Sequence, residues 1–224
     1  VPMTVAQVLN VLYSVVDRMY IGHIPGESSL ALTGVGLTFP IISMVTAFSN
    51  LYGMGGAPLC SIARGEGKLE RAEEIMENSF WMLTATGAVL TVFFLAVQRP
   101  LLYAFGASED TIGYAVSYLT IYLLGSLFVM VGLGMNPFIN AQGFGVTGMV
   151  TVGMGALINL VLDPVFIFVL HMGVRGAALA TIFSQFCSAV WVMRFLTGKR
   201  AILRLRLGRP KIDRALCRQI VTLG

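Results

Sequence analysis

Four long stretches of this sequence carry no charged side chain, and they constrain the fold more than any other feature. Residues 28–63, 78–98, 111–162 and 176–193 contain no Asp, Glu, Lys or Arg. A helix needs about 20 apolar residues to cross a bilayer, so the stretch 111–162 is long enough for two crossings and a turn. Only 12% of the residues are charged, against roughly 25% in an ordinary soluble domain. The sequence therefore indicates an integral membrane protein.

Apolar runs separated by turn signals predict six membrane-spanning helices. Their approximate ranges are 2–22, 33–58, 78–98, 112–135, 147–170 and 174–196. Helix breakers and caps lie in the connections, for example HIPGESS after the first span and QRPLLYAFGASED after the third. We therefore predict an all-α integral membrane protein, folded as a bundle of six transmembrane helices.

The basic residues are distributed unevenly over the connections, and this predicts the orientation. With the N-terminus in the cytoplasm, the opposite side holds only Arg99 and Arg175. The cytoplasmic side then holds Arg64, Lys68, Arg71, Arg194, Lys199, Arg200, Arg204, Arg206, Arg209, Lys211, Arg214 and Arg218. Because cytoplasmic loops carry an excess of Lys and Arg, we place both ends in the cytoplasm and the protein in the cell inner (plasma) membrane.

The chain divides into a bundle, residues 1–196, and a basic tail. Residues 197–215 form a basic cytoplasmic linker, and residues 216–224 turn apolar again, as the start of a further span does. Leucines interleaved with basic residues fit either a segment on an anionic membrane surface or a solvated linker. Because the first residue is Val1 and no basic leader precedes the first apolar run, we expect a fragment or a chain trimmed at its start.

Two acidic residues, Asp17 and Asp163, fall inside predicted spans. A charge at the bilayer centre costs at least about 2.5 kcal/mol, which makes such acids candidates for function. At 1.5 Å per residue, the predicted topology puts both roughly 8 to 11 Å below the outer edge. Thr181 arrives at the same depth, and Asn159 lies one turn deeper on the face of Asp163. The four residues can meet if the first, fifth and sixth spans are neighbours.

The chemistry of these four residues suits a proton or a hard cation. Burial penalises the charged form of a carboxylic acid and so favours proton uptake. Carboxylate, amide and hydroxyl oxygens are also the donors that Na⁺ prefers. We therefore predict that Asp17, Asn159, Asp163 and Thr181 bind H⁺ or Na⁺. Pro164 removes a backbone donor directly after the acid and permits a bend in the helix.

Simpler explanations remain open for each of these residues. Asp17 could pair with Arg18 near the lipid headgroups. Asn159 and Thr181 could be ordinary interhelical hydrogen-bonding residues, which are common in membrane helices. The hypothesis that Asn159 and Thr181 bind an ion depends on their position relative to the two acids.

Several classes of function find no support in the sequence. The three Cys residues lack CxxC spacing, which argues against a zinc site or a disulfide framework. Gly143, Gly145 and Gly148 fit G-x-G-x-x-G, but no strand precedes them. The sequence contains no HExxH, no GxSxG and no phosphate loop, and no basic surface interleaved with aromatic residues. We expect neither an enzyme nor a cofactor, and no nucleic-acid partner.

The sequence resembles the multidrug and toxic compound extrusion (MATE) transporters, in particular their prokaryotic DinF-like branch. The matching segments are VPMTVAQVLNVLYSVVDRMYIGHIPGESSLALTGVGLTFPI, GGAPLCSIARGEGKLERAEEIMENS, GALINLVLDPVFIF and GVRGAALATIFSQ. The resemblance implies one lobe of a twelve-helix transporter with two six-helix lobes. The chain would comprise the N-terminal lobe, the inter-lobe linker and the truncated start of helix seven, without the C-terminal lobe.

The resemblance also implies roles for individual residues. Asp17, Asn159, Asp163 and Thr181 stand where the family has its N-lobe cation or proton site, and Pro2 stands where a proline associated with bending of helix one occurs. We therefore expect an H⁺- or Na⁺-coupled antiporter that exports organic cations and amphipathic drugs by alternating access. Its partners would be these drugs, the lipid bilayer and the C-terminal lobe. A flippase for lipid-linked oligosaccharides, and a non-transporting scaffold or channel half, are the alternatives.

Overall fold

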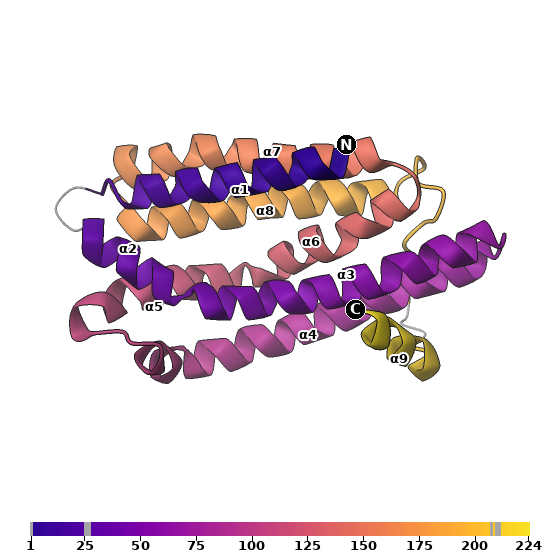
Figure 1. Ribbon diagram of the computed structural model, residues 1–224, viewed down its shortest axis with the longest axis horizontal. Coiled ribbons are helices and arrows are strands. Elements are labelled where there is room, and N and C mark those ends of the chain that lie inside the picture. Colours follow the sequence, from indigo (N-terminus) through magenta and orange to yellow (C-terminus); the bar gives the residue numbers. More distant parts are fainter. Residues whose placement is uncertain (1, 25–27, 207, 209–211) are drawn as a thin grey trace.

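The computed structural model describes residues 2–24, 28–206, 208 and 212–224. Every regular element in the described part of the chain is a helix, as the sequence predicts (Figure 1). The elements are α1 (Pro2–Ile21), α2 (Ser28–Leu37), α3 (Phe39–Gly65), α4 (Leu69–Ala104), α5 (Glu109–Leu124), α6 (Ser126–Ala141), α7 (Gly145–Pro164), η1 (Val165–Val169), α8 (Gly173–Thr197) and α9 (Arg214–Leu223).

The predicted spans correspond to long helical segments. Among the described residues, four segments are long and apolar enough to cross a membrane: Ser29–Gly65, Leu69–Ala104, Gly145–Val169 and Gly173–Thr197. The bent pair formed by α5 and α6 makes a fifth if it is one span. The predicted first span is α1, which has 20 residues, the length that a crossing needs. It is not among the apolar candidates, because its sequence includes polar residues such as Asp17 and Arg18.

Two spans are interrupted, the first beside a proline and the second at a glycine. Pro40 lies in the first turn of α3, where its missing N–H costs nothing. The chain therefore restarts as α3 after Thr38. The second break is at Gly125, where α5 and α6 meet at 56°. A Cβ added at Gly125 would overlap the side chain of Ile182 on α8, so glycine allows α8 to approach the bend closely.

The helix that carries Asp163 changes its winding directly after that residue. Pro164 is the last residue of α7, and the chain continues as the π-helical segment η1. The Leu170 amide donates to the Val165 carbonyl five residues earlier, at 2.9 Å. Such segments are rare and often lie near functional sites. Pro2 is the first residue of α1, but its side chain lies outside the described part of the structure, so its bending role stays a prediction.

The helices form two layers joined through α6. In Figure 1, α1, α7 and α8 lie side by side, with α3 and α4 on the other side of the molecule. Helix α6 packs against both α8 and α3. Helices α3 and α6 cross closely because Gly53 has no Cβ. A Cβ at this position would lie 2.6 Å from the Gly134 carbonyl oxygen. The Ser49 hydroxyl also donates to the Met130 carbonyl at 3.0 Å. This crossing fixes the position of α6, against which α7 and α8 pack.

Candidate functional site

The structure brings the two predicted acids into contact between α1 and α7. Asp17 lies in the last turns of α1, Asp163 lies at the end of α7, and the two helices pack together. The carboxyl groups of Asp17 and Asp163 interact directly, and Asp163 is only 1% exposed. Two ionised carboxylates that are neighbours repel one another. A proton shared between them, or a bound cation, removes that repulsion.

Asn159 supports the acid pair from one helical turn away. Its side-chain nitrogen donates to Asp163 Oδ1 at 3.2 Å, and the residue is 1% exposed. The Oδ1 atoms of Asn159 and Asp17 are both buried, and neither has a hydrogen-bond partner among the described residues. Buried acceptors without a donor are costly. The site therefore offers two oxygen atoms that a cation or a proton donor would satisfy.

Thr181 lies on α8 and lines a cavity that Asp17 also lines. Its hydroxyl donates to the Ala177 carbonyl of its own helix at 3.0 Å, and it also interacts with the Tyr118 hydroxyl. Thr181 and Asp17 line the same cavity, whereas Asn159 and Asp163 do not line it. Asp17 is thus the residue that the buried pair and the cavity share.

This first cavity, of about 300 Å³, opens beside Asp17. Its polar and aromatic lining includes Tyr13, Asp17, Arg18, Phe39, Tyr118, Tyr122, Thr181 and Gln185. The Arg18 guanidinium lies over the Phe39 ring, 4.8 Å from its centroid. Asp17 contacts Asp163 instead, so the two neighbours in sequence turn to different partners. Tyr118 and Tyr122 stack with their ring centroids 6.5 Å apart.

A second cavity, of about 290 Å³, was missed by the sequence analysis. It shares Tyr13, Leu133 and Gln185 with the first cavity. Its other polar lining residues are Asn50, Asn136, Asn140, Thr151, Ser184 and Ser188. The Oδ1 atoms of Asn136 and Asn140 are buried without a hydrogen-bond partner among the described residues. The available signal was the i, i+4 spacing of these two amides in an uncharged stretch, because residues so spaced share a helix face.

The donor set of the site is made of oxygen atoms. Across the described residues, no group of three or more His, Cys, Asp or Glu is placed to hold a metal ion. A cation at Asp17 and Asp163 would therefore be held by carboxylate oxygens, with the amide oxygen of Asn159 nearby. Such oxygen sets suit hard cations rather than zinc or copper.

Acidic residues and polar cavities between helices of membrane length are typical of polytopic membrane proteins that bind ions or solutes within the helix bundle. The MatE family model matches residues 2–165. The chain belongs to the MatE family of transporters, as its resemblance indicated, and it corresponds to the N-terminal lobe. Members of this family are transporters and not a class of enzymes.

Curated relatives align with the whole chain. The multidrug export protein MepA of Staphylococcus haemolyticus is 27% identical over 100% of this chain and 49% of its own length. The MepA of Staphylococcus saprophyticus is 23% identical with the same coverage. The chain thus spans about half the length of the curated relatives it matches.

Solved structures with the same fold also extend to about twice this length. A MOP superfamily transporter from Pyrococcus furiosus, described as having a binding pocket of reverse polarity, superimposes with a TM-score of 0.91 at 25% identity. The match covers 99% of this chain and 49% of that chain. A MATE transporter in complex with MaD3S gives a TM-score of 0.92 at 25% identity, covering 99% and 50%. These likenesses confirm the predicted all-helical lobe.

Proposed function

We propose that this chain is the N-terminal lobe of a cation-coupled multidrug efflux antiporter, which exports organic cations and amphipathic compounds by alternating access. The family membership and the names of the relatives, multidrug export proteins, support this assignment. The coupling ion is H⁺ or Na⁺. The observation that carries the proposal is the contact between Asp17 and Asp163 across the α1–α7 interface.

The acid pair provides a means of coupling ion binding to helix movement. With a proton or Na⁺ between the carboxyl groups, α1 and α7 are held together. When the ion leaves, two negative charges about 4 Å apart repel by roughly 4 kcal/mol at an effective dielectric constant of 20. That energy changes an equilibrium between two conformations about 1,000-fold. Ion release therefore favours separation of α1 from α7, and ion binding favours the packed arrangement.

The two cavities suit the proposed substrates. Aromatic rings from Tyr13, Tyr118 and Tyr122 provide faces for organic cations, and the amide of Gln185 provides a hydrogen-bonding group between the cavities. Each cavity is close to the lower limit of the roughly 300 to 1,000 Å³ range typical of ligand pockets. A drug-sized compound would thus fill both cavities or extend toward the C-terminal lobe.

We further propose that residues 1–196 form the lobe, residues 197–215 the inter-lobe linker, and residues 216–224 the start of helix seven. In the structure, the final helix α9 begins slightly earlier, at Arg214. The distribution of Lys and Arg supports a cytoplasmic N-terminus and linker in the inner membrane. The C-terminal lobe would supply the second half of the central cleft.

The test uses the full-length transporter in proteoliposomes, with an imposed gradient of H⁺ or Na⁺ and a fluorescent organic cation as substrate. Asp163→Asn keeps the side-chain shape but removes the charge, so we expect it to abolish efflux at an unchanged expression level. Efflux by the unsubstituted protein under each gradient identifies the coupling ion.

The matched control is Asp110→Asn, because Asp110 is an exposed acid in the first turn of α5. This variant should export at the unsubstituted rate. Full export by Asp163→Asn would refute the proposal. An oligosaccharide flippase is less well supported, because it would be expected to need a basic cleft, and Arg18 is the one basic side chain among the described residues that line the two cavities.

A further inference from the structure

The beginning of the basic tail lies against the helical bundle. Residues 201–206, here called the strap, follow α8 and alternate between buried and exposed positions. Ala201, Leu203 and Leu205 are 6%, 0% and 4% exposed, and the residues between them are exposed. A period of two is that of an extended segment with one packed face. The strap leucines therefore enter the protein core, and not a membrane surface.

The buried side of the strap is hydrogen-bonded to two helices. The Leu203 amide donates to the Gln142 side-chain oxygen at 2.9 Å, at the end of α6. The Leu205 amide donates to the Leu196 carbonyl at 2.9 Å, in the last turn of α8. Gln142 is only 2% exposed, so its side chain is a fixed acceptor inside the protein.

The exposed side of the strap is bound by the first turns of α4. The Arg204 amide donates to Glu73 at 3.0 Å, and the Arg206 amide donates to Glu77 at 3.3 Å. Glu73 and Glu77 are four residues apart and so lie on one face of α4. The Arg206 guanidinium also pairs with Glu73 at 3.3 Å. Four consecutive backbone amides, those of residues 203–206, are therefore bound to the bundle.

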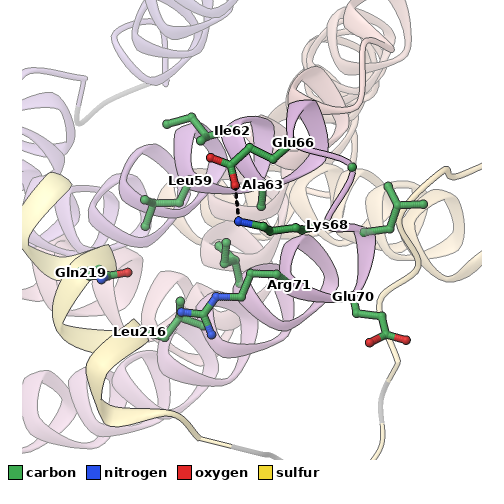
Figure 2. A pocket seen from close by; sticks show the side chains of 12 residues that line it. Leu59, Ile62, Ala63, Glu66, Lys68, Glu70, Arg71, Leu216 and Gln219 are labelled. Atoms are coloured by element: carbon green, nitrogen blue, oxygen red, sulfur yellow. Dashed lines mark hydrogen bonds and ion pairs between the residues drawn. The ribbon is translucent and has the colours of Figure 1, made fainter.

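Helix α9, further along the tail, also packs on the bundle, since Leu216 and Ile220 are 1% and 0% exposed and belong to the core. The Asp213 amide donates to Asn78 at 3.1 Å, and the Asp213 carboxylate lies 3.6 Å from Arg71. Beyond these contacts lies a cavity of about 680 Å³ between α9 and the α3–α4 turn. Figure 2 shows Gln219 of α9 on one side of this cavity and Lys68 on the other, with the Arg71 side chain extending toward Leu216. The strap is bound through its backbone amides, whereas α9 packs through its apolar face and borders this cavity on one side.

We propose that the strap clamps the adjacent ends of α4, α6 and α8 together and stays bound to this lobe throughout the transport cycle. The connection to the second lobe then begins mechanically after residue 206, and lobe movement acts on the chain beyond the strap and not on the strap. That this lobe undergoes a transport cycle rests on the function proposed above.

Hydrogen–deuterium exchange on the intact transporter in detergent micelles tests the strap. We expect the amides of residues 203–206 to exchange at least about tenfold more slowly than in a free chain, and equally with and without saturating ethidium. The double variant Glu73→Ala, Gln142→Ala should exchange about 2- to 10-fold faster for each hydrogen bond lost. Its initial rate of ethidium efflux should fall several-fold.

The control is Glu70→Ala, which removes an exposed acid from the first turn of α4 without touching the strap. Its exchange and efflux should equal those of the unsubstituted protein. Free-chain exchange, or protection lost when ethidium binds, would overturn the proposal. So would faster exchange in the double variant with unchanged efflux, because the strap would then be a passive contact. A protein that keeps the protected strap but exports nothing would refute the proposed function and leave the strap intact.

Discussion

The close crossing of α3 and α6 gives the sharpest prediction of stability. Gly53→Ala adds a Cβ that would lie 2.6 Å from the Gly134 carbonyl oxygen and 3.2 Å from the Gly134 Cα. Real Cβ contacts are longer than this, so α3 and α6 must separate by several tenths of an ångström. The obstructing atom belongs to a helix backbone and cannot rotate away, unlike the end of a side chain. The separation also stretches the 3.0 Å hydrogen bond from Ser49 to Met130.

The expected cost follows from these contacts. Overpacking a well-packed interior costs about 1 to 3 kcal/mol, and the rigid backbone neighbour places this variant in the upper half of that range. Alanine also stabilises a helix relative to glycine, by about 1 kcal/mol. Gly113→Ala measures that gain by itself, because a Cβ at Gly113 in α5 meets nothing within 4 Å. We therefore expect Gly53→Ala to be about 2 to 3 kcal/mol less stable than Gly113→Ala.

The assay is thermal unfolding of the detergent-solubilised transporter at one heating rate, because membrane proteins often unfold irreversibly. A difference of 2 to 3 kcal/mol corresponds to a Tm difference of roughly 5 to 10 °C for a chain of this size, and to about half of that for a transporter of twice the length, because the entropy of unfolding grows with size. A Tm of Gly53→Ala equal to or above that of Gly113→Ala would contradict the conclusion that α3 and α6 leave no room for a Cβ at Gly53.

Further variants test the site. Asn159→Ala removes the donor to Asp163 within α7, and a side-chain hydrogen bond in a membrane protein contributes about 0.6 kcal/mol, so efflux measured in proteoliposomes should fall about threefold. Thr181→Val should reduce efflux less than twofold, since its hydroxyl already bonds within its own helix; a loss as large as that of Asp163→Asn would make Thr181 a ligand. Phe39→Leu removes the ring beneath Arg18, which contributes about 0.5 to 1 kcal/mol, and should lower the Tm by roughly 1 to 4 °C. An unchanged Tm would show that this contact does not stabilise the fold.

The helical spans were predictable because they depend on local composition. Uncharged runs of membrane length must be helical in lipid, since every backbone N–H and C=O must find an internal partner there. The bend within the predicted span 112–135 was not predictable. It depends on Ile182, which belongs to a different helix and packs where Gly125 leaves space.

The sequence predicted the depth of the candidate site in the membrane, but not which of its residues contact one another. The topology placed Asp17 and Asp163 in the same layer, and Asn159 on the same helix face as Asp163. Whether α1 and α7 are neighbours is a long-range property, which a single sequence does not specify. The second cavity, with Asn136 and Asn140, was missed because isolated amides in membrane helices are usually ordinary packing residues.

The sequence by itself determined that this chain is helical with spans of membrane length, and that Asp17 and Asp163 fall inside those spans, because the solvation of the backbone and of charge is decided residue by residue. The tertiary structure decided which helices meet, and hence that Asp17 contacts Asp163 while Thr181 bonds to its own helix. It also decided that Leu203 and Leu205 of the basic tail enter the protein core. Those outcomes depend on packing between segments far apart in sequence, where glycines such as Gly53 set how closely two helices approach.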